Sequence, residues 1–161
     1  MKKLLVITLC IITLVFSACS GNNEKFEAKL SEQKEVSKVK LTELTDFKWD
    51  YAYFISPYVS KEEIEKIISI KSDEIQDNNN NDSTIYVVFT EKNKVVYQLF
   101  GDAQNLGFSF DLGKYKKVKR ISCDNCDFSV QNKDGKYTEI QEVKASINGK
   151  IVQALGTRLG Q

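Results

Sequence analysis

The stretch from Ile85 to Phe100, IYVVFTEKNKVVYQLF, dictates the architecture of this 161-residue chain. Two apolar runs, Ile85–Glu91 and Lys94–Phe100, flank the pair Lys92-Asn93, and this pattern predicts a β-hairpin with a two-residue turn. The predicted cross-strand pairs are Glu91 with Lys94, Phe89 with Val96 and Ile85 with Phe100. Because both faces of the hairpin are largely apolar, we expect it at the centre of a sheet that is covered on both sides.

A strand and a helix are predicted upstream of this hairpin. Residues 47–55, FKWDYAYFI, predict a strand that Pro57 ends. Its period of two places one row of side chains on a single face, namely Phe47, Trp49, Tyr51, Tyr53 and Ile55. The sequence Ser60-Lys61-Glu62-Glu63 has the form of a capping box. The apolar stripe after it predicts a helix of about ten residues that ends near Ile70.

More strands are predicted downstream. Residues 106–112 predict a short strand, and turns are predicted at Asp124-Asn125, 133–135 and Asn148-Gly149. The pairs expected across the last two turns are Phe128 with Ile140, Val130 with Thr138, Ala145 with Val152 and Val143 with Ala154. These elements predict an α+β fold, a mostly antiparallel β-sheet meander with one helix packed on it, forming a single domain at residues 41–161.

The N-terminus carries a targeting pattern. A basic start, Met1–Lys3, precedes an apolar run from Leu4 that is long enough for a signal peptide and short for a membrane span. The following Phe16-Ser17-Ala18-Cys19 resembles the lipobox of bacterial lipoproteins, in which the cysteine receives a diacylglyceryl group and becomes the new N-terminus. The resemblance implies a signal peptide at residues 1–18 and acyl chains, such as palmitate, on Cys19. An ordinary secretory signal that contains a cysteine is the alternative.

Lipidation would determine where the domain is located. Acyl chains hold a soluble domain on a bilayer because each buried methylene contributes about 0.8 kcal/mol. We therefore expect a cell-envelope protein that is anchored to a membrane and faces outside the cytoplasm. Residues 20–40 are rich in Lys, Glu, Ser and Asn, so residues 19–40 are predicted to be the lipidated cysteine and a flexible tether. A helix docked on the domain is the alternative for this segment.

The composition limits the chemistry that the chain can perform. With 23 basic and 22 acidic residues, it lacks the basic surplus that nucleic-acid binding requires. It contains no histidine, which excludes Ser-His-Asp and Cys-His mechanisms and removes the commonest metal ligand. We therefore expect no nucleic-acid partner, no metal site, no cofactor and no catalytic residue.

The motif Cys123-Asp124-Asn125-Cys126 is the most chemically distinctive segment. Outside the cytoplasm an even pair of cysteines predicts a disulfide, and across a two-residue turn their α-carbons would be about 5.5 Å apart, within disulfide range. Two free thiols, a redox centre and a metal site are the alternatives. A redox centre requires a thiolate stabilised at a helix N-terminus, whereas this motif is predicted to be strand–turn–strand.

Two surface segments each have two interpretations. The basic run at residues 114–120, KYKKVKR, either attracts anionic headgroups or wall polymers or protects an edge strand from aggregation, and we favour the second. The polar loop at residues 77–83, DNNNNDS, is expected to be solvated. The alternative is a cation site built from Asp77, Asp82 and the asparagine carbonyls.

An aromatic row also has two interpretations. It consists of Trp49, Tyr51, Tyr53 and Tyr58. Trp and Tyr are typical contact residues at interfaces, so the row is a candidate binding surface. The alternative, which we favour, is the inner face of the sheet covered by the helix.

The segment that contains this row also carries a resemblance. Phe47-x-Trp49-Asp50, followed by Phe54-x-x-Pro57-Tyr58-x-Ser60-Lys61-Glu62-Glu63-Ile64, looks like a group of small uncharacterised bacterial lipoproteins. The order of a helix followed by antiparallel strands is also loosely similar to the outer-membrane assembly and β-lactamase-inhibitor type of lipoprotein domain. The second resemblance implies protein binding, and neither carries catalytic residues.

These observations predict a non-catalytic, lipid-anchored binding protein outside the cytoplasm. Its expected partners are a membrane, through the anchor, and another protein, as for an immunity or inhibitor lipoprotein or an envelope component. The rival hypothesis is an extracytoplasmic enzyme. It would be a thiol oxidoreductase using Cys123 and Cys126, or a hydrolase using carboxylates such as Asp50 and Glu63.

Overall fold

The computed structural model describes residues 21–33, 36–79, 82–133, 137–143, 146–147 and 150–151. The predicted signal peptide and Cys19 lie outside these residues. Within them, no helix has the length and apolar character needed to cross a membrane.

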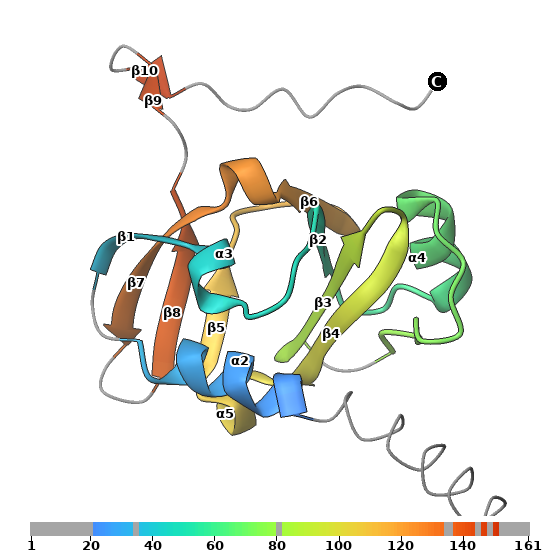
Figure 1. Ribbon diagram of the computed structural model, residues 1–161, viewed down its shortest axis with the longest axis horizontal. Coiled ribbons are helices and arrows are strands. Elements are labelled where there is room, and N and C mark those ends of the chain that lie inside the picture. Colours follow the sequence, from blue (N-terminus) through green and yellow to red (C-terminus); the bar gives the residue numbers. More distant parts are fainter. Residues whose placement is uncertain are drawn as a thin grey trace, which may run out of the picture.

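Two sheets pack against each other (Figure 1). The first, here called the hairpin sheet, is antiparallel and has the strand order β4 (Lys94–Asp102), β3 (Thr84–Glu91), β2 (Tyr51–Ile55) and β6 (Val118–Ser122). The second sheet has the order β1 (Val36–Lys40), β7 (Asp127–Lys133), β8 (Tyr137–Glu142) and β5 (Phe108–Asp111), and β5 runs parallel to β8. A separate antiparallel pair joins β9 (Ser146–Ile147) to β10 (Lys150–Ile151). The predicted α+β, mainly antiparallel fold is confirmed, with its strands divided between two sheets.

Short helices cover the sheets. α2 (Gly21–Ser31) and α5 (Ala103–Leu106) lie at the same end of the two sheets, and α3 (Leu41–Leu44) follows β1 (Figure 1). α4 (Lys61–Ile68) covers the outer face of the hairpin sheet because its buried Ile64 and Ile68 pack with side chains of β2 and β3. Ser60 caps α4 as predicted, accepting a hydrogen bond from the Glu63 N–H at 3.3 Å.

The hairpin sheet is buried on both faces, as predicted. Toward the second sheet, Phe54, Val87 and Phe89 pack in the larger core cluster, which the second sheet supplies with Phe108, Phe128 and Ile140. On the opposite face, Tyr53, Ile55, Tyr86 and Val88 pack beneath α4. Fully burying such side chains stabilises the fold by about 1.5–3 kcal/mol each. The apolar, two-sided pattern of β3 therefore explains why this strand lies inside the sheet.

The hairpin turn forms as predicted, but the strand register does not. Lys92 and Asn93 both have positive φ, 49° and 60°, as a two-residue hairpin turn requires, and Glu91 pairs with Lys94. A bulge then shifts the register, so that Phe89 pairs with Tyr97 rather than Val96, and Ile85 with Gly101 rather than Phe100. The cause is packing, because Val96 is left 38% exposed while Tyr97 turns into the core.

The predicted flexible tether is wrong for the described part of residues 20–40. Residues 21–31 form α2, and residues 36–40 form β1, which pairs with β7. Phe26 and Leu30, four residues apart on α2, are fully buried in the larger core cluster. Phe26 packs edge-to-face against Phe47, Phe89 and Tyr97. The docked-helix alternative is therefore the observed one, and the domain begins well before residue 41.

The turn predicted at Asp124-Asn125 does not close a hairpin. β6 pairs with β2 in the hairpin sheet, whereas β7 pairs with β1 and β8 in the second sheet. The chain crosses between the sheets through a 3₁₀ turn at Cys123–Asn125. The alternation of apolar and polar residues on both sides of this turn suggested a hairpin. The segment is instead a crossover, because β6 and β7 pair with strands of different sheets.

Three C-terminal predictions have different outcomes. Leu106 belongs to α5, which Gly107 ends at φ 77°, so the strand β5 begins only at Phe108. In the β7–β8 pair, Val130 lies opposite Ile140 and Phe128 opposite Glu142, so each partner is two residues beyond the predicted one. Lys150 pairs with Ile147, as a two-residue turn at Asn148-Gly149 requires. The further pairs Ala145 with Val152 and Val143 with Ala154 include residues outside the described part of the chain.

Candidate binding surface

The structure divides the predicted aromatic row between both faces of the hairpin sheet. Trp49 is buried in the core between the sheets, where its indole N–H donates to Thr45 Oγ1 at 3.1 Å. Tyr53 is buried on the other face, beneath α4. Tyr51 and Tyr58 are exposed, at 37% and 67%. Trp49 and Tyr53 therefore do not share a surface, and only the two exposed tyrosines are accessible to a partner.

Asp50 is the reason that the row is divided. Its backbone N–H donates to Thr90 O at 2.7 Å, and its carboxylate accepts from the Lys92 N–H at 2.7 Å. These bonds hold the end of the β3–β4 turn, and regular strand geometry begins only at Tyr51. Residues 47–50 are consequently irregular, and the period of two does not extend back to Trp49.

Tyr51 carries a stacked cation from the neighbouring strand. The guanidinium carbon of Arg120, in β6, lies 4.9 Å from the centre of the Tyr51 ring. The same guanidinium reaches Tyr53, whose pKa is raised above its ordinary value by burial, an effect that Arg120 and a hydrogen bond with Thr90 partly offset. Such exposed cation–π contacts stabilise by about 0.5–1 kcal/mol. The contact holds Arg120 at the surface beside Tyr51.

Tyr58 has an unusual backbone conformation. Its φ is 64°, in the left-handed region that is costly for a bulky residue. The turn is held by the Tyr58 N–H, which donates to Asn78 O at 2.5 Å, and by the Asn78 N–H, which donates to Val59 O at 2.9 Å. The result is an aromatic side chain fixed in an exposed position by backbone bonds to a distant segment.

Asn78 is a residue that the sequence analysis missed. It is completely buried, and its amide nitrogen donates to Ile55 O at 3.3 Å and to Ser56 O at 2.9 Å. Its Oδ1 atom has no hydrogen-bond partner among the described residues. The expected solvated loop is therefore wrong for Asn78. The only local signal was a run of asparagines, which does not say which member points inward.

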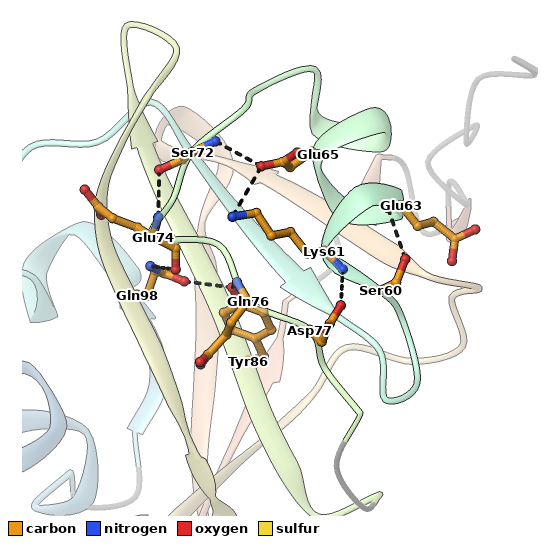
Figure 2. Close-up of polar contacts among 10 residues, drawn as sticks. All are labelled: Ser60, Lys61, Glu63, Glu65, Ser72, Glu74, Gln76, Asp77, Tyr86 and Gln98. Carbon is orange, nitrogen blue, oxygen red and sulfur yellow. Dashed lines mark hydrogen bonds and ion pairs between the residues drawn. The ribbon is translucent and has the colours of Figure 1, made fainter.

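A polar network fixes the segment that carries this turn (Figure 2). Asp77 accepts from the Lys61 N–H at 2.6 Å, and Glu65 accepts from the Ser72 N–H at 3.1 Å. Tyr86 links the segment to the hairpin by accepting from the Gln76 N–H at 3.1 Å and donating to the Gln98 side chain at 2.7 Å. Because Asp77 serves the start of α4, its carboxylate is committed to a structural role.

The basic run at residues 114–120 leads into β6, an outer strand of the hairpin sheet, as the edge-strand interpretation predicts. Lys117 pairs with Glu63, and Lys119 pairs with Glu142. The Lys119 ammonium also donates to Leu112 O at 2.7 Å. Two of the lysines are thus neutralised by carboxylates, which weakens the hypothesis of a continuous polyanion site.

Exposed tyrosines and one arginine lie at intervals along β6 and just beyond its first residue. We define the β6-edge surface as Tyr51, Tyr58, Tyr115 and Arg120. Tyr115 is 37% exposed, and its partial burial raises the pKa of its phenol, an effect that Ser56 partly offsets. The Ser56 N–H donates to Lys117 O at 2.8 Å, which places the Tyr58 turn beside the start of β6. Tyr and Arg are the residue types most enriched among strong interface contacts.

The predicted disulfide is not formed, because Cys123 and Cys126 are free thiols. Cys126 is buried, and its thiol donates to Cys123 O at 3.1 Å within the 3₁₀ turn. The pKa of Cys123 is raised, first by burial and then by the nearby charges of Asp124 and Asp50. Since a nucleophilic thiol needs a lowered pKa, this site does not favour the oxidoreductase hypothesis.

The proposed hydrolase pair is also separated. Asp50 precedes β2, whereas Glu63 on α4 pairs with Lys117 beyond the opposite end of that strand. Strands rise about 3.3 Å per residue, so the two carboxylates are about 15–20 Å apart. Paired carboxylates that share one reaction are within about 10 Å. Asp50 and Glu63 therefore do not form a catalytic pair.

The described residues contain no group of three or more Cys, Asp or Glu side chains that could hold a metal ion. Comparison with known proteins adds no relative, since no family model, no curated protein and no solved structure matches the chain. The function of the chain therefore has to be inferred from its own sequence and geometry.

Proposed function

We propose that this chain is a lipid-anchored protein of the cell envelope, facing outside the cytoplasm, that binds another protein through its β6-edge surface. Immunity or inhibitor activity and a role as an envelope component are the two forms of this function. The anchor is inferred from the lipobox-like Phe16-Ser17-Ala18-Cys19 alone. The binding role is inferred from the surface.

The turn at Tyr58 is the observation that supports binding. Backbone strain of this kind costs about 1–3 kcal/mol and persists where the surrounding structure enforces it, often at contact sites. Here a buried asparagine, Asn78, and the anchored segment after α4 enforce it. The strained turn leaves the Tyr58 side chain 67% exposed.

Site-specific photo-cross-linking in the source cells tests the binding role. A photoreactive phenylalanine at Tyr58 should capture a discrete protein, and the same group at Val96 should not. Val96 is the matched control because it is an exposed apolar residue on β4, the opposite edge of the hairpin sheet. Once purified, the captured protein should bind the unmodified chain. It should bind the Tyr58→Ala variant at least about tenfold more weakly. Equal capture from both positions would contradict the proposal.

Metabolic labelling tests the anchor separately. Cells fed an alkyne-bearing palmitate should incorporate it into the native chain and not into Cys19→Ala, and the variant should leave the membrane fraction. Cys123→Ala is the matched control, and its labelling should equal that of the native chain. A Cys19→Ala protein that still fractionates with membranes would refute lipid anchoring.

A further inference from the structure

The hydrogen-bond pattern leaves the outer side of β6 open. The Ser56 N–H donates to Lys117 O, and the Cys123 N–H donates to Asp50 O at 3.0 Å. Antiparallel pairs alternate between bonded and non-bonded residues, so odd-numbered residues of β6 face β2. The backbone N–H and C=O groups of Val118, Arg120 and Ser122 therefore point away from the sheet. In the described part of the chain no residue hydrogen-bonds to these groups of Val118 and Arg120 or to the Ser122 N–H, whereas the Ser122 C=O belongs to the 3₁₀ turn that Ser122 caps.

Arg120 projects from β6 over the Tyr51 ring of the neighbouring strand β2, one strand inward from the outer edge. No carboxylate of the described residues pairs with it, and its guanidinium is held over the Tyr51 ring. The Tyr53 hydroxyl takes up part of the hydrogen-bonding capacity of the guanidinium, and the remaining N–H groups can donate to a carboxylate. The strand thus carries a positioned cation beside a row of outward-pointing backbone groups.

Basic side chains also lie near Arg120 at the start of β6. Lys114 and Lys116, just before β6, are exposed and have no carboxylate partner in the described residues. Glu63 and Glu142, which do reach this edge, are each occupied by a lysine. The start of the edge therefore complements an acidic ligand, whereas Asp50 and Asp124 lie near its Ser122 end. The open backbone groups complement an extended ligand.

We infer that the partner protein contributes an extended acidic segment, which adds as a strand to the outer edge of β6. This inference rests on the proposed function. Its backbone pairs with Val118, Arg120 and Ser122, and one of its carboxylates binds Arg120. Main-chain hydrogen bonds supply affinity in this mode, and the side-chain contacts supply specificity.

Amide hydrogen exchange on the full chain in lipid nanodiscs tests this inference. The probe is a blocked peptide of sequence TEVEVEVT, and its matched control is TKVKVKVT. With the acidic peptide, exchange at the Val118, Arg120 and Ser122 amides should slow about tenfold or more. Exchange at Lys119 and Ile121, already bonded to β2, should not change. Binding of both peptides alike, or binding without this alternating protection, would overturn the inference.

Two variants separate the backbone from the charge. Val118→Pro removes an outward N–H at the first residue of an edge strand, where proline is tolerated; it should abolish the protection pattern while the thermal midpoint stays close to native. Arg120→Gln should weaken peptide binding about tenfold, and Lys94→Gln on β4 should not. Failure of the acidic peptide to bind at millimolar concentration would overturn strand addition. It would leave the Tyr58 cross-linking result, and with it the proposed function, unaffected.

Discussion

The two outer strands of the hairpin sheet, β4 and β6, end that sheet in different ways. β4 is interrupted by the bulge at Val96, and its side chains contact distant segments. Tyr97 reaches Phe26 and Glu27 of α2, and Gln98 donates to Glu74 O at 2.7 Å. Bulges and covering elements are the usual means of preventing strand pairing at an edge.

Among the described residues, β6 has neither a bulge nor a covering element. Its register against β2 is continuous from Tyr51–Ser122 to Ile55–Val118. Basic side chains discourage another strand from pairing with β6, but two of them, Lys117 and Lys119, are neutralised by Glu63 and Glu142. In the described residues the hairpin sheet therefore has one edge that a bulge and side-chain contacts interrupt, here called the closed edge, and one continuous edge at β6. The exposure of β6 is thus a local property and not a general consequence of the fold.

Removing the cover from β4 should have the largest effect. Phe26→Ala empties a fully buried site between α2 and β4, and comparable truncations cost about 3–5 kcal/mol. Urea unfolding should show this loss, whereas Lys25→Ala, an exposed neighbour on α2, should change stability by less than about 0.5 kcal/mol. Similar values for both variants would mean that α2 does not close this edge.

Loosening the turn beside β6 should cost less. Asn78→Ala removes two buried hydrogen bonds to the backbone of Ile55 and Ser56, and we expect a loss of about 1–3 kcal/mol. The unpartnered Oδ1 atom disappears with the side chain, which favours the lower end of this range. Asn79→Ala, exposed and adjacent, is the control for thermal denaturation. A neutral Asn78→Ala would show that the Tyr58 turn is held by other contacts.

The closed edge should also respond to alkaline pH. The pKa of Tyr97 is raised by burial and by the negative charge of Glu27. Below about pH 10 both the folded and the unfolded states keep the phenol proton. Above it only the unfolded state releases the proton, so stability falls as pH rises. Tyr97→Phe should flatten this fall in urea midpoints between about pH 9 and 11. An identical slope in both proteins would exclude Tyr97 as a source.

The smallest stability effect is expected at the open edge. Arg120→Gln removes an exposed cation–π contact, so the loss should be below about 1 kcal/mol. The same substitution should strongly reduce partner binding. A calorimetric midpoint several degrees lower would instead identify Arg120 as part of the structural framework, and the contrast between the two edges would weaken.

The sequence predicted the elements whose causes are local. The Lys92-Asn93 turn, the Ser60 cap and the two-sided burial of β3 each depend on residues close together in the chain. These features were correct because turn geometry and hydrophobic period need no distant partner.

The incorrect predictions concern features of the structure that depend on contacts between residues far apart in the chain. The Val96 bulge exists because Tyr97 packs against α2, and α2 itself was misassigned because Phe26 and Leu30 are two apolar residues in a polar segment. Asn78 is buried by a turn twenty residues earlier in the chain. Its inward orientation could not be derived from a run of like residues.

The docked position of α2 also limits how far from a bilayer this domain can act. Gly21, its first residue, follows Cys19 by two residues, which span at most about 7 Å. An acyl group on Cys19 would therefore hold the domain directly over the headgroup layer, with no long tether between them. Encounters would then occur by lateral diffusion, between molecules confined to the same leaflet or reaching down to it. A ligand suspended far out in the surrounding medium would remain beyond its range.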